Sequence, residues 1–292
     1  MPTSLQSALQ PWSLSLPLTL AGVLSAIFYL RGWLHLRSAP ENPIPAWRAA
    51  SFLSGLFLIW LAVSSPLAAF DEQLLTVHMI QHLLLMTFAP ALILLGAPVM
   101  PLLHGFPRQF VQSILGPALR WTPVQRIGRA VSHPAVCWLA ATAALAGWHV
   151  PAAFTLALQS ELWHAAEHAS FLAAGFLFWW PVVQPWPSIS VWPRWSILLY
   201  LFLATLPCDI LSAYLTFCDR VVYPFYLSTP RPFGISVLAD QQCAGALMWT
   251  CITIVYLVPA VIVTTQLLAA RPPYRATAIN PSATHNRRAS PL

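Results

Sequence analysis

Two histidine pairs in this sequence have a spacing that could bind a metal ion. His78 and His82 occur in "HMIQH", within an apolar stretch long enough to cross a bilayer. His164 and His168 occur in "HAAEH", together with Glu167. Residues four apart lie on one face of an α-helix, about 6 Å apart along its axis, and this spacing lets two imidazoles of one helix reach the same ion. We therefore expect both pairs to face the interior from helices that are in contact.

Three further residues are candidate ligands. His149 occurs in "GWHVP", Asp240 opens "DQQCAGALMW", and Met248 lies near the end of that run. Asp240 has two interpretations, direct ligation or structural support, and Met248 is a core residue by default, although a thioether also favours Cu(I). Gln241 and Gln242 are expected to form hydrogen bonds between helices. A single intramembrane histidine is more often a packing residue than a ligand, so the metal prediction depends on several histidines sharing one depth.

The composition is that of an integral membrane protein. Hydrophobic residues make up 58% of the chain and charged residues only 8%, far from the values of soluble domains. The apolar runs are about 20 residues long and do not alternate as barrel strands do. We predict an all-α polytopic membrane bundle of about seven transmembrane helices, a single domain over residues 1–270, with a disordered cytoplasmic tail at 271–292. The predicted spans are 13–34, 49–66, 75–96, 133–151, 161–182, 195–217 and 241–268.

The arginines predict how the chain is oriented. The sequence contains no lysine, and twelve of its fourteen arginines fall on one side of the predicted spans. By the positive-inside rule that side is cytoplasmic, which puts the N-terminus outside and the C-terminus in the cytoplasm. The positive net charge is therefore a topology signal that suits anionic lipid headgroups. It gives no support for nucleic-acid binding.

With this topology, five of the nine histidines lie in the outer third of the membrane although they belong to three spans. Ionisable groups inside a bilayer are costly and normally face the bundle interior, so we predict one outward-opening metal site. Cys208 and Asp209, in mid-membrane, are expected to face the same pocket. A disulfide between Cys218 and Cys243 on the outer face is an alternative to two free thiols that the sequence does not decide. The predicted metal-site residues are His78, His82, His149, His164, His168, Glu167, Asp240 and Met248.

Three blocks of the chain resemble a known family. "HMIQHLLLMTFAPALILLGAP", "GWHVPAAFTLALQSELWHAAEHASFLAAGFLFWWPVV" and "PFGISVLADQQCAGALMW" are similar to the signature blocks of the CtaG family of multispanning bacterial cytochrome c oxidase assembly factors. The resemblance runs from about residue 45 to residue 268. It implies a protein of the bacterial plasma (inner) membrane that helps to produce an active haem-copper oxidase through copper supply. The family's acidic turn corresponds to Asp240, and its histidines correspond to His78, His82, His149, His164 and His168.

Imidazole ligands suit copper, zinc and iron alike, and the thioethers of Met79, Met86 and Met248 at the same layer favour copper, with zinc or iron as other possibilities. The expected function is reversible copper binding and delivery, with haem-copper oxidase subunits or a periplasmic copper chaperone as partners and no catalysis. One alternative is a metal-dependent membrane enzyme, because His164, Glu167 and His168 match the H-x-x-E-H pattern of zinc hydrolases, and a histidine and glutamate set could also hold two irons. A second alternative is a bis-His haem protein, although paired histidines on one helix argue against it.

Overall fold

The computed structural model describes residues 14–37, 44–184, 192–231 and 233–269. All regular secondary structure in these ranges is helical, which confirms the all-α prediction. The predicted tail at 271–292 lies outside the described residues. The long elements are α2 (Leu16–Arg37), α3 (Ala46–Ser64), α4 (Leu75–His82) continuing through a π-helical turn η2 (Leu83–Phe88) into α5 (Ala89–Leu95), α10 (Pro134–Trp148), α12 (Glu161–Val183), α13 (Trp195–Phe217) and α14 (Val237–Ala269).

Five helical segments among the described residues are long and apolar enough to span a membrane, and six if the bent pair α9 (Thr122–Val131) and α10 counts as one span. The five include α2, α13 and α14, the segment Ala46–Phe70, and Leu75–Leu95. α12 is outside this set although it has 23 residues, because its first turns carry two glutamates and two histidines. The predicted count of about seven spans therefore stays a prediction.

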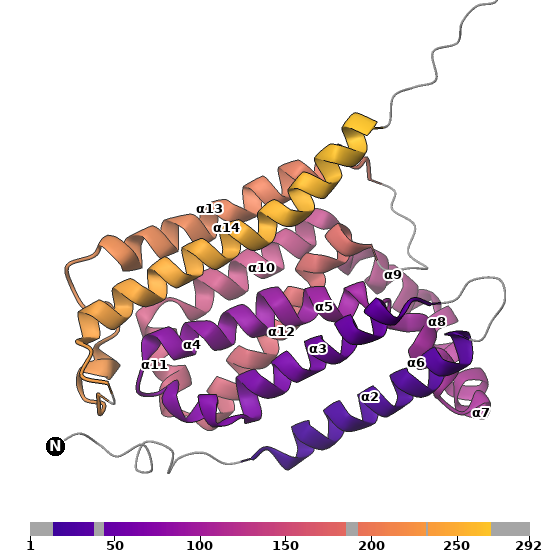
Figure 1. The fold of residues 1–292 in the computed structure, drawn as a ribbon, viewed down its shortest axis with the longest axis horizontal. Helices are drawn as coiled ribbons and strands as arrows, with labels where there is room; N and C mark the ends of the chain where they lie inside the picture. Colours follow the sequence, from indigo (N-terminus) through magenta and orange to yellow (C-terminus); the bar gives the residue numbers. More distant parts are fainter. Residues whose placement is uncertain (1–13, 38–43, 185–191, 232, 270–292) are drawn as a thin grey trace, which may run out of the picture.

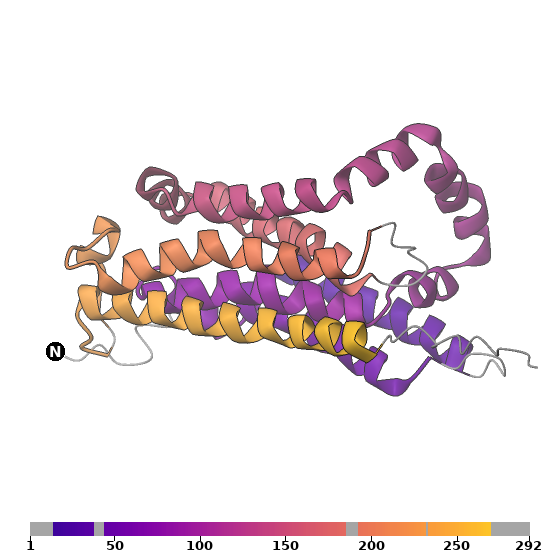
Figure 2. The same ribbon diagram turned by 90° about the horizontal axis from the view of Figure 1, so that it is seen from above.

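The long helices run side by side, as Figure 1 shows, with α13 and α14 on one flank and α2 and α3 on the other. α12 packs against α10, α5 and η2 in the interior. Seen from above in Figure 2, α9 and its neighbours extend beyond one end of the bundle. The short elements at that end are α6 (Val99–Gly105), α7 (Arg108–Phe110), the π-helical η3 (Val111–Leu115) and α8 (Gly116–Arg120), whereas η1 (Pro66–Phe70), α11 (Pro151–Gln159) and η4 (Pro224–Leu227) lie at the opposite end.

Small residues allow the helices that matter for function to approach closely. A Cβ atom placed on Gly175 of α12 would lie 2.5 Å from the carbonyl oxygen of Met86 in η2. A Cβ on Gly245 of α14 would lie 2.9 Å from the carbonyl oxygen of Ser212 in α13. Helix association inside a membrane depends on such close packing, because lipid supplies no hydrophobic drive between helices. Gly175 thereby brings α12 against the segment that continues α4.

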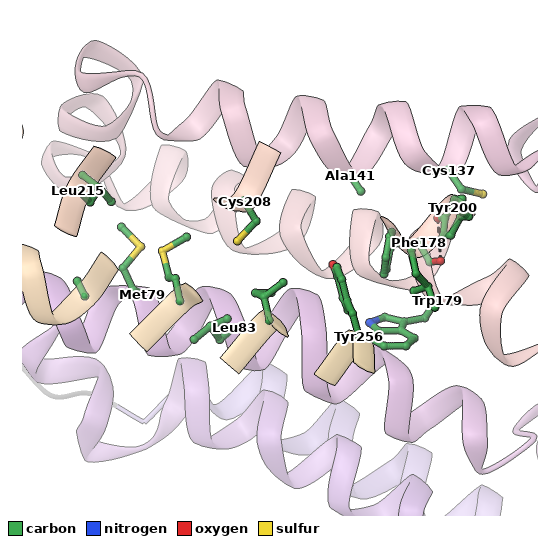
Figure 3. Close-up of a cluster of buried hydrophobic side chains, with 14 of the residues drawn as sticks. Met79, Leu83, Cys137, Ala141, Phe178, Trp179, Tyr200, Cys208, Leu215 and Tyr256 are labelled. Carbon is green, nitrogen blue, oxygen red and sulfur yellow. Dashed lines mark hydrogen bonds between the residues drawn. The ribbon is translucent and has the colours of Figure 1, made fainter. Parts of the chain in front are cut away.

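The largest core cluster fills the space between α4, α10, α12, α13 and α14. Figure 3 shows Met79, Leu83, Phe178, Cys208 and Tyr256 converging there from facing helices. The helix that begins as α4 becomes irregular beside this cluster, since η2 is a π-helical turn. Pro207 lies inside the facing helix α13, where it has no backbone N–H to donate. Such irregular turns inside helices are frequent at functional sites.

The N-terminus of α4 is held by a carboxylate from another helix. Asp240 of α14 accepts hydrogen bonds from the backbone amides of Leu75 and Thr76 at 2.8 and 3.1 Å, and from the Thr76 hydroxyl at 2.7 Å. A carboxylate here satisfies amides that have no partner within the helix and complements the positive end of its dipole. Arg231 lies 3.4 Å from the same carboxylate and donates to the carbonyl of Gln73.

Replacing Asp240 tests whether it holds α4. Asp240→Asn keeps the size of this buried side chain, but an amide NH2 would face backbone donors and the charge beside Arg231 would be lost. We expect unfolding stability to fall by about 1–3 kcal/mol. The measurement is thermal unfolding of the purified protein in detergent, with the exposed Asp219→Asn as a matched control. Equal melting temperatures for the two variants would contradict the assignment.

Candidate metal centre

The first histidine pair faces the interior from α4. His78 is fully buried and His82 is 5% exposed, and their ring centroids are 4.3 Å apart in an edge-to-face arrangement. The pair shares one face because four residues make slightly more than one helical turn. α4 starts at Leu75, where Asp240 caps it, so both rings lie near the end of the bundle that carries η1 and α11.

The second pair faces the first from α12. The rings of His164 and His168 are 4.2 Å apart. His78 and His164 stack at 5.6 Å, and His82 lies 6.2 Å from His168. The expectation that the two pairs meet in the interior is therefore confirmed for these four imidazoles. The spacing of four residues predicted that each pair shares one face of its helix. The contact of α12 with η2 brings the two faces together.

Glu167 lies between the two helices and is fully buried. Its Oε1 is 3.4 Å from His82 Nε2, and its Oε2 is 3.7 Å from His78 Nε2. These contacts are longer than the roughly 2.8 Å of a charge-assisted hydrogen bond. One carboxylate thus has an imidazole opposite each of its oxygens, at distances that leave room for a shared cation.

Asp71 is a member of this centre that sequence reasoning missed. It follows η1 and is 4% exposed. Its Oδ2 lies 3.6 Å from His164 Nε2 and accepts a hydrogen bond from Gln81 Nε2 at 3.1 Å. The available signal was an acidic residue just before the span that carries His78. From sequence alone such a residue is assigned to a solvated loop. The contact of Asp71 with α12 depends on how η1 packs against distant helices, which the local sequence does not show.

Ligand atoms from six residues form three overlapping triplets in which all atoms lie within 4.8 Å of one another. Each of His78, His164 and Glu167 belongs to two of the three triplets. The arrangement could therefore hold one ion or two ions that share Glu167. The triplets are Asp71, His78 and His164; His78, His82 and Glu167; and His164, Glu167 and His168.

The buried polar atoms of the centre fit a cation. Both ring nitrogens of His78 and of His82, both carboxylate oxygens of Glu167, and Nε2 of His164 and His168 are buried without a hydrogen bond. Each such group costs about 1–3 kcal/mol when it is left without a partner. Imidazole nitrogen and carboxylate oxygen are ligands for copper, zinc and iron. A metal ion bound in one triplet would take a ligand atom from each of its three residues.

His149 approaches the centre from the end of α10 without joining a triplet. Its ring lies 5.7 Å from that of His82. Its Nδ1 is 2.7 Å from the Leu145 carbonyl oxygen and its Nε2 is 3.4 Å from Met79 Sδ. Met248 is buried in the core cluster beside Met79. Five of the eight predicted residues therefore belong to the triplets, and His149 and Met248 lie next to them. The carboxylate of Asp240 instead binds the N-terminus of α4.

Aromatic residues of α11 and of the segment between α13 and α14 cover the centre. Phe154 of α11 contacts His78 at 4.8 Å between ring centroids and stacks on Tyr223 at 4.0 Å. The Tyr226 hydroxyl donates to the carbonyl of Asp71 at 2.9 Å. Burial raises the pKa of the Tyr226 phenol well above its usual range, so this hydroxyl remains a neutral donor. This aromatic cover was not predicted from the sequence, because it depends on contacts between distant segments.

Other polar predictions have mixed outcomes. Gln241 of α14 donates to the carbonyl of Leu215 in α13 at 3.4 Å, which is the predicted bond between helices. It also accepts a hydrogen bond from the Val222 amide at 2.8 Å and donates to the carbonyl of Arg220, both in the segment after α13. Cys218 and Cys243 are both free thiols, and Cys243 is exposed, so the structure contains no disulfide between them. Asp209 belongs to none of the triplets.

Comparison with known proteins supplies the family. Residues 27–270 match the sequence model of the cytochrome c oxidase caa3 assembly factors (Caa3_CtaG). A protein of Mycobacterium bovis described as uncharacterized is 27% identical over 255 residues, which cover 85% of this chain and 38% of that protein. One from Mycobacterium leprae is 25% identical over 251 residues, covering 85% and 37%. No solved structure matches.

The chain thus spans well under half the length of these mycobacterial relatives. The family match begins within α2 and continues beyond the end of α14. It includes every residue of the three triplets. The chain therefore belongs to the family of cytochrome c oxidase caa3 assembly factors.

Proposed function

We propose that this protein binds copper as cargo in the centre between α4 and α12 and delivers it to a haem-copper oxidase during assembly. The observation that carries the proposal is the set of buried imidazole and carboxylate atoms around Glu167 that have no hydrogen bond. Membership of an oxidase assembly family supports the purpose, since such oxidases contain copper. The recipient is an oxidase subunit, and the donor is a periplasmic copper chaperone.

The chemistry of the residues supports transfer in preference to permanent storage. Six residues offer more ligand atoms than one ion needs, so an ion can exchange one ligand for another without losing all of them. His164 is the most accessible member, with 19% of its side chain exposed. In this proposal His164 and Asp71 receive the ion at the open side, and His78, His82 and His168 hold it around Glu167.

The proposed location is the bacterial inner membrane, with seven spans, the N-terminus outside and the copper centre near the outer face. Support comes from the arginines of α7, α8 and α9, which gather at the end of the bundle remote from the centre. α12 is counted as a span because it has 23 residues and packs inside the bundle. α10 is counted because α9 and α10 together are long and apolar enough to cross a membrane.

Fusions of a reporter test this orientation. A reporter joined after residue 271 should be active only in the cytoplasm, and one inserted near Phe70 only outside, because the arginine-rich loops are retained on the cytoplasmic side. The measurement uses a pair of enzymes, one active in each compartment. The opposite pattern would put the metal centre at the cytoplasmic face and remove a periplasmic copper source.

One observation favours a second candidate function. Glu167 belongs to two of the three triplets, which is the geometry of a bridging carboxylate or of a general base beside a metal. In a hydrolase or di-iron enzyme, Glu167 would accept a proton from bound water. A carrier needs no such proton acceptor, so the two functions make different demands on this residue.

The variant Glu167→Gln separates the carrier from the enzyme. It keeps the side-chain size and one carbonyl oxygen but removes the charge, so a carrier should lose part of its copper and oxidase maturation should fall in proportion. An enzyme that needs the base would keep its metal and lose about 10²- to 10⁴-fold in rate. The measurements are metal content of the purified variant and oxidase activity of the membranes.

His168→Ala and His104→Ala serve as controls. His168 contributes a ligand atom to a triplet, so its loss should lower both readouts. His104 lies exposed on α6 at the other end of the bundle, and its replacement should leave both unchanged. Full metal occupancy in Glu167→Gln with almost no mature oxidase would overturn the carrier and favour the enzyme.

A further inference from the structure

A small cavity of about 40 Å³ adjoins the metal centre and shares His82 with it. It is larger than the roughly 10–15 Å³ that one water requires. It lies beside η2 and Pro207, between α4, α10, α13 and α14. The residues relevant to its chemistry are Met79, Met86, Cys208, Met248, His82 and His149.

The lining concentrates sulfur. The chain has five methionines, and three of them line this one cavity together with Cys208. Met79, Met248 and Cys208 are buried, and Figure 3 shows the sulfur atoms of Met79 and Cys208 extending into the space between α4 and α13. Methionine often fills core gaps, so the number of sulfurs alone does not make a site.

A second observation does point to a ligand. His149 Nδ1 lies 2.7 Å from the Leu145 carbonyl oxygen, which can only accept, so this nitrogen carries the proton of the neutral ring. The lone pair of Nε2 therefore faces Met79 Sδ at 3.4 Å. A thioether has no proton to donate. Two buried lone-pair donors directed at each other are favourable when a cation lies between or beside them.

The chemistry of the lining selects the kind of cation. Thioether and thiol ligands favour Cu(I), whereas carboxylate ligands suit harder ions. No aspartate or glutamate lines the cavity, and an uncompensated charge in such surroundings is costly. The cost of burying the charge is smaller for a monovalent soft ion bound by sulfur and imidazole than for the divalent Zn²⁺.

We propose that this cavity is a second copper site, specific for Cu(I), in which the sulfurs of Met79, Met248 and Cys208 act with Nε2 of His149. The proposal rests on the copper-carrier function above and adds a route to it. His82 lines the cavity and also belongs to a triplet of the centre. Cu(I) moves by ligand exchange: a bond from copper to His82 breaks while a bond to sulfur forms, and no electron is transferred.

The test compares variants of the full-length protein in detergent, one of which lacks two of the three proposed sulfur ligands. Met79→Leu combined with Met248→Leu keeps the shape of two side chains, at a cost usually below about 1.5 kcal/mol each. Met100→Leu is the matched control, because Met100 lies on α6 and does not line the cavity. The probes are Cu(I) in competition with a chromogenic chelator, Zn²⁺ alone, and X-ray absorption of the Cu(I)-loaded protein.

We expect sulfur ligands around Cu(I) in the wild-type protein and in Met100→Leu. The double variant should bind Cu(I) about 10- to 100-fold more weakly and show a clearly smaller sulfur signal, because only the sulfur of Cys208 remains of the three proposed sulfur ligands. Its Zn²⁺ binding should stay unchanged, which shows that the fold is intact. A wild-type spectrum with only nitrogen and oxygen ligands would overturn the proposal even if the double variant did not fold. Unchanged Cu(I) affinity in the folded double variant would also overturn it.

His164→Ala distinguishes this failure from failure of the carrier function. If the methionine variant matches the wild type while His164→Ala lowers copper binding, the sulfur site is wrong and the centre around Glu167 stands. If neither change affects copper binding, the carrier function is wrong as well, because copper then depends on neither set of ligands.

Discussion

The fold is organised around a carboxylate that has been taken out of water. Glu167 is fully buried in α12, and an ionised carboxylate in an apolar interior is costly unless cations or donors surround it. Here four imidazoles lie around it, two from α4 and two from α12. A metal ion bound by these groups would compensate that charge. The spacing of both histidine pairs, and the close approach of α12 to η2 at Gly175, follow from that requirement.

A second set of polar residues holds the centre in place without joining it. Asp240 caps α4, Gln241 binds the backbone after α13, and Arg231 ties Asp240 to the segment before α4. These bonds connect the start of α14 to the start of α4, at the end of the bundle where the centre lies. Polar side chains in a membrane bundle are each worth only about 0.6 kcal/mol, but together they determine where His78 and His82 face. Some acidic and amide side chains thus position the helices, whereas others offer ligand atoms for a metal ion.

Local features of the sequence were sufficient for the helices and for the histidine faces. The predicted segment 195–217 coincides with α13, and 161–182 ends one residue before α12 does. Helical spacing alone paired His78 with His82 and His164 with His168. What sequence reasoning missed depends on contacts between distant segments: Asp71 reaches the centre through the turn of η1, and the short helices α6 to α9 form from a stretch without long apolar runs. The role of Asp240 was left open for the same reason, because capping α4 from α14 is a tertiary contact.

The central claim is that the buried set around Glu167 binds copper. Metal analysis of the protein purified from membranes, together with its optical absorption spectrum, tests this most directly. The account predicts copper in an amount comparable with that of the protein. It also predicts no Soret band, since Cu(I) is colourless and histidines paired on one helix argue against haem binding. A Soret band, or tightly held zinc or iron in place of copper, would contradict it.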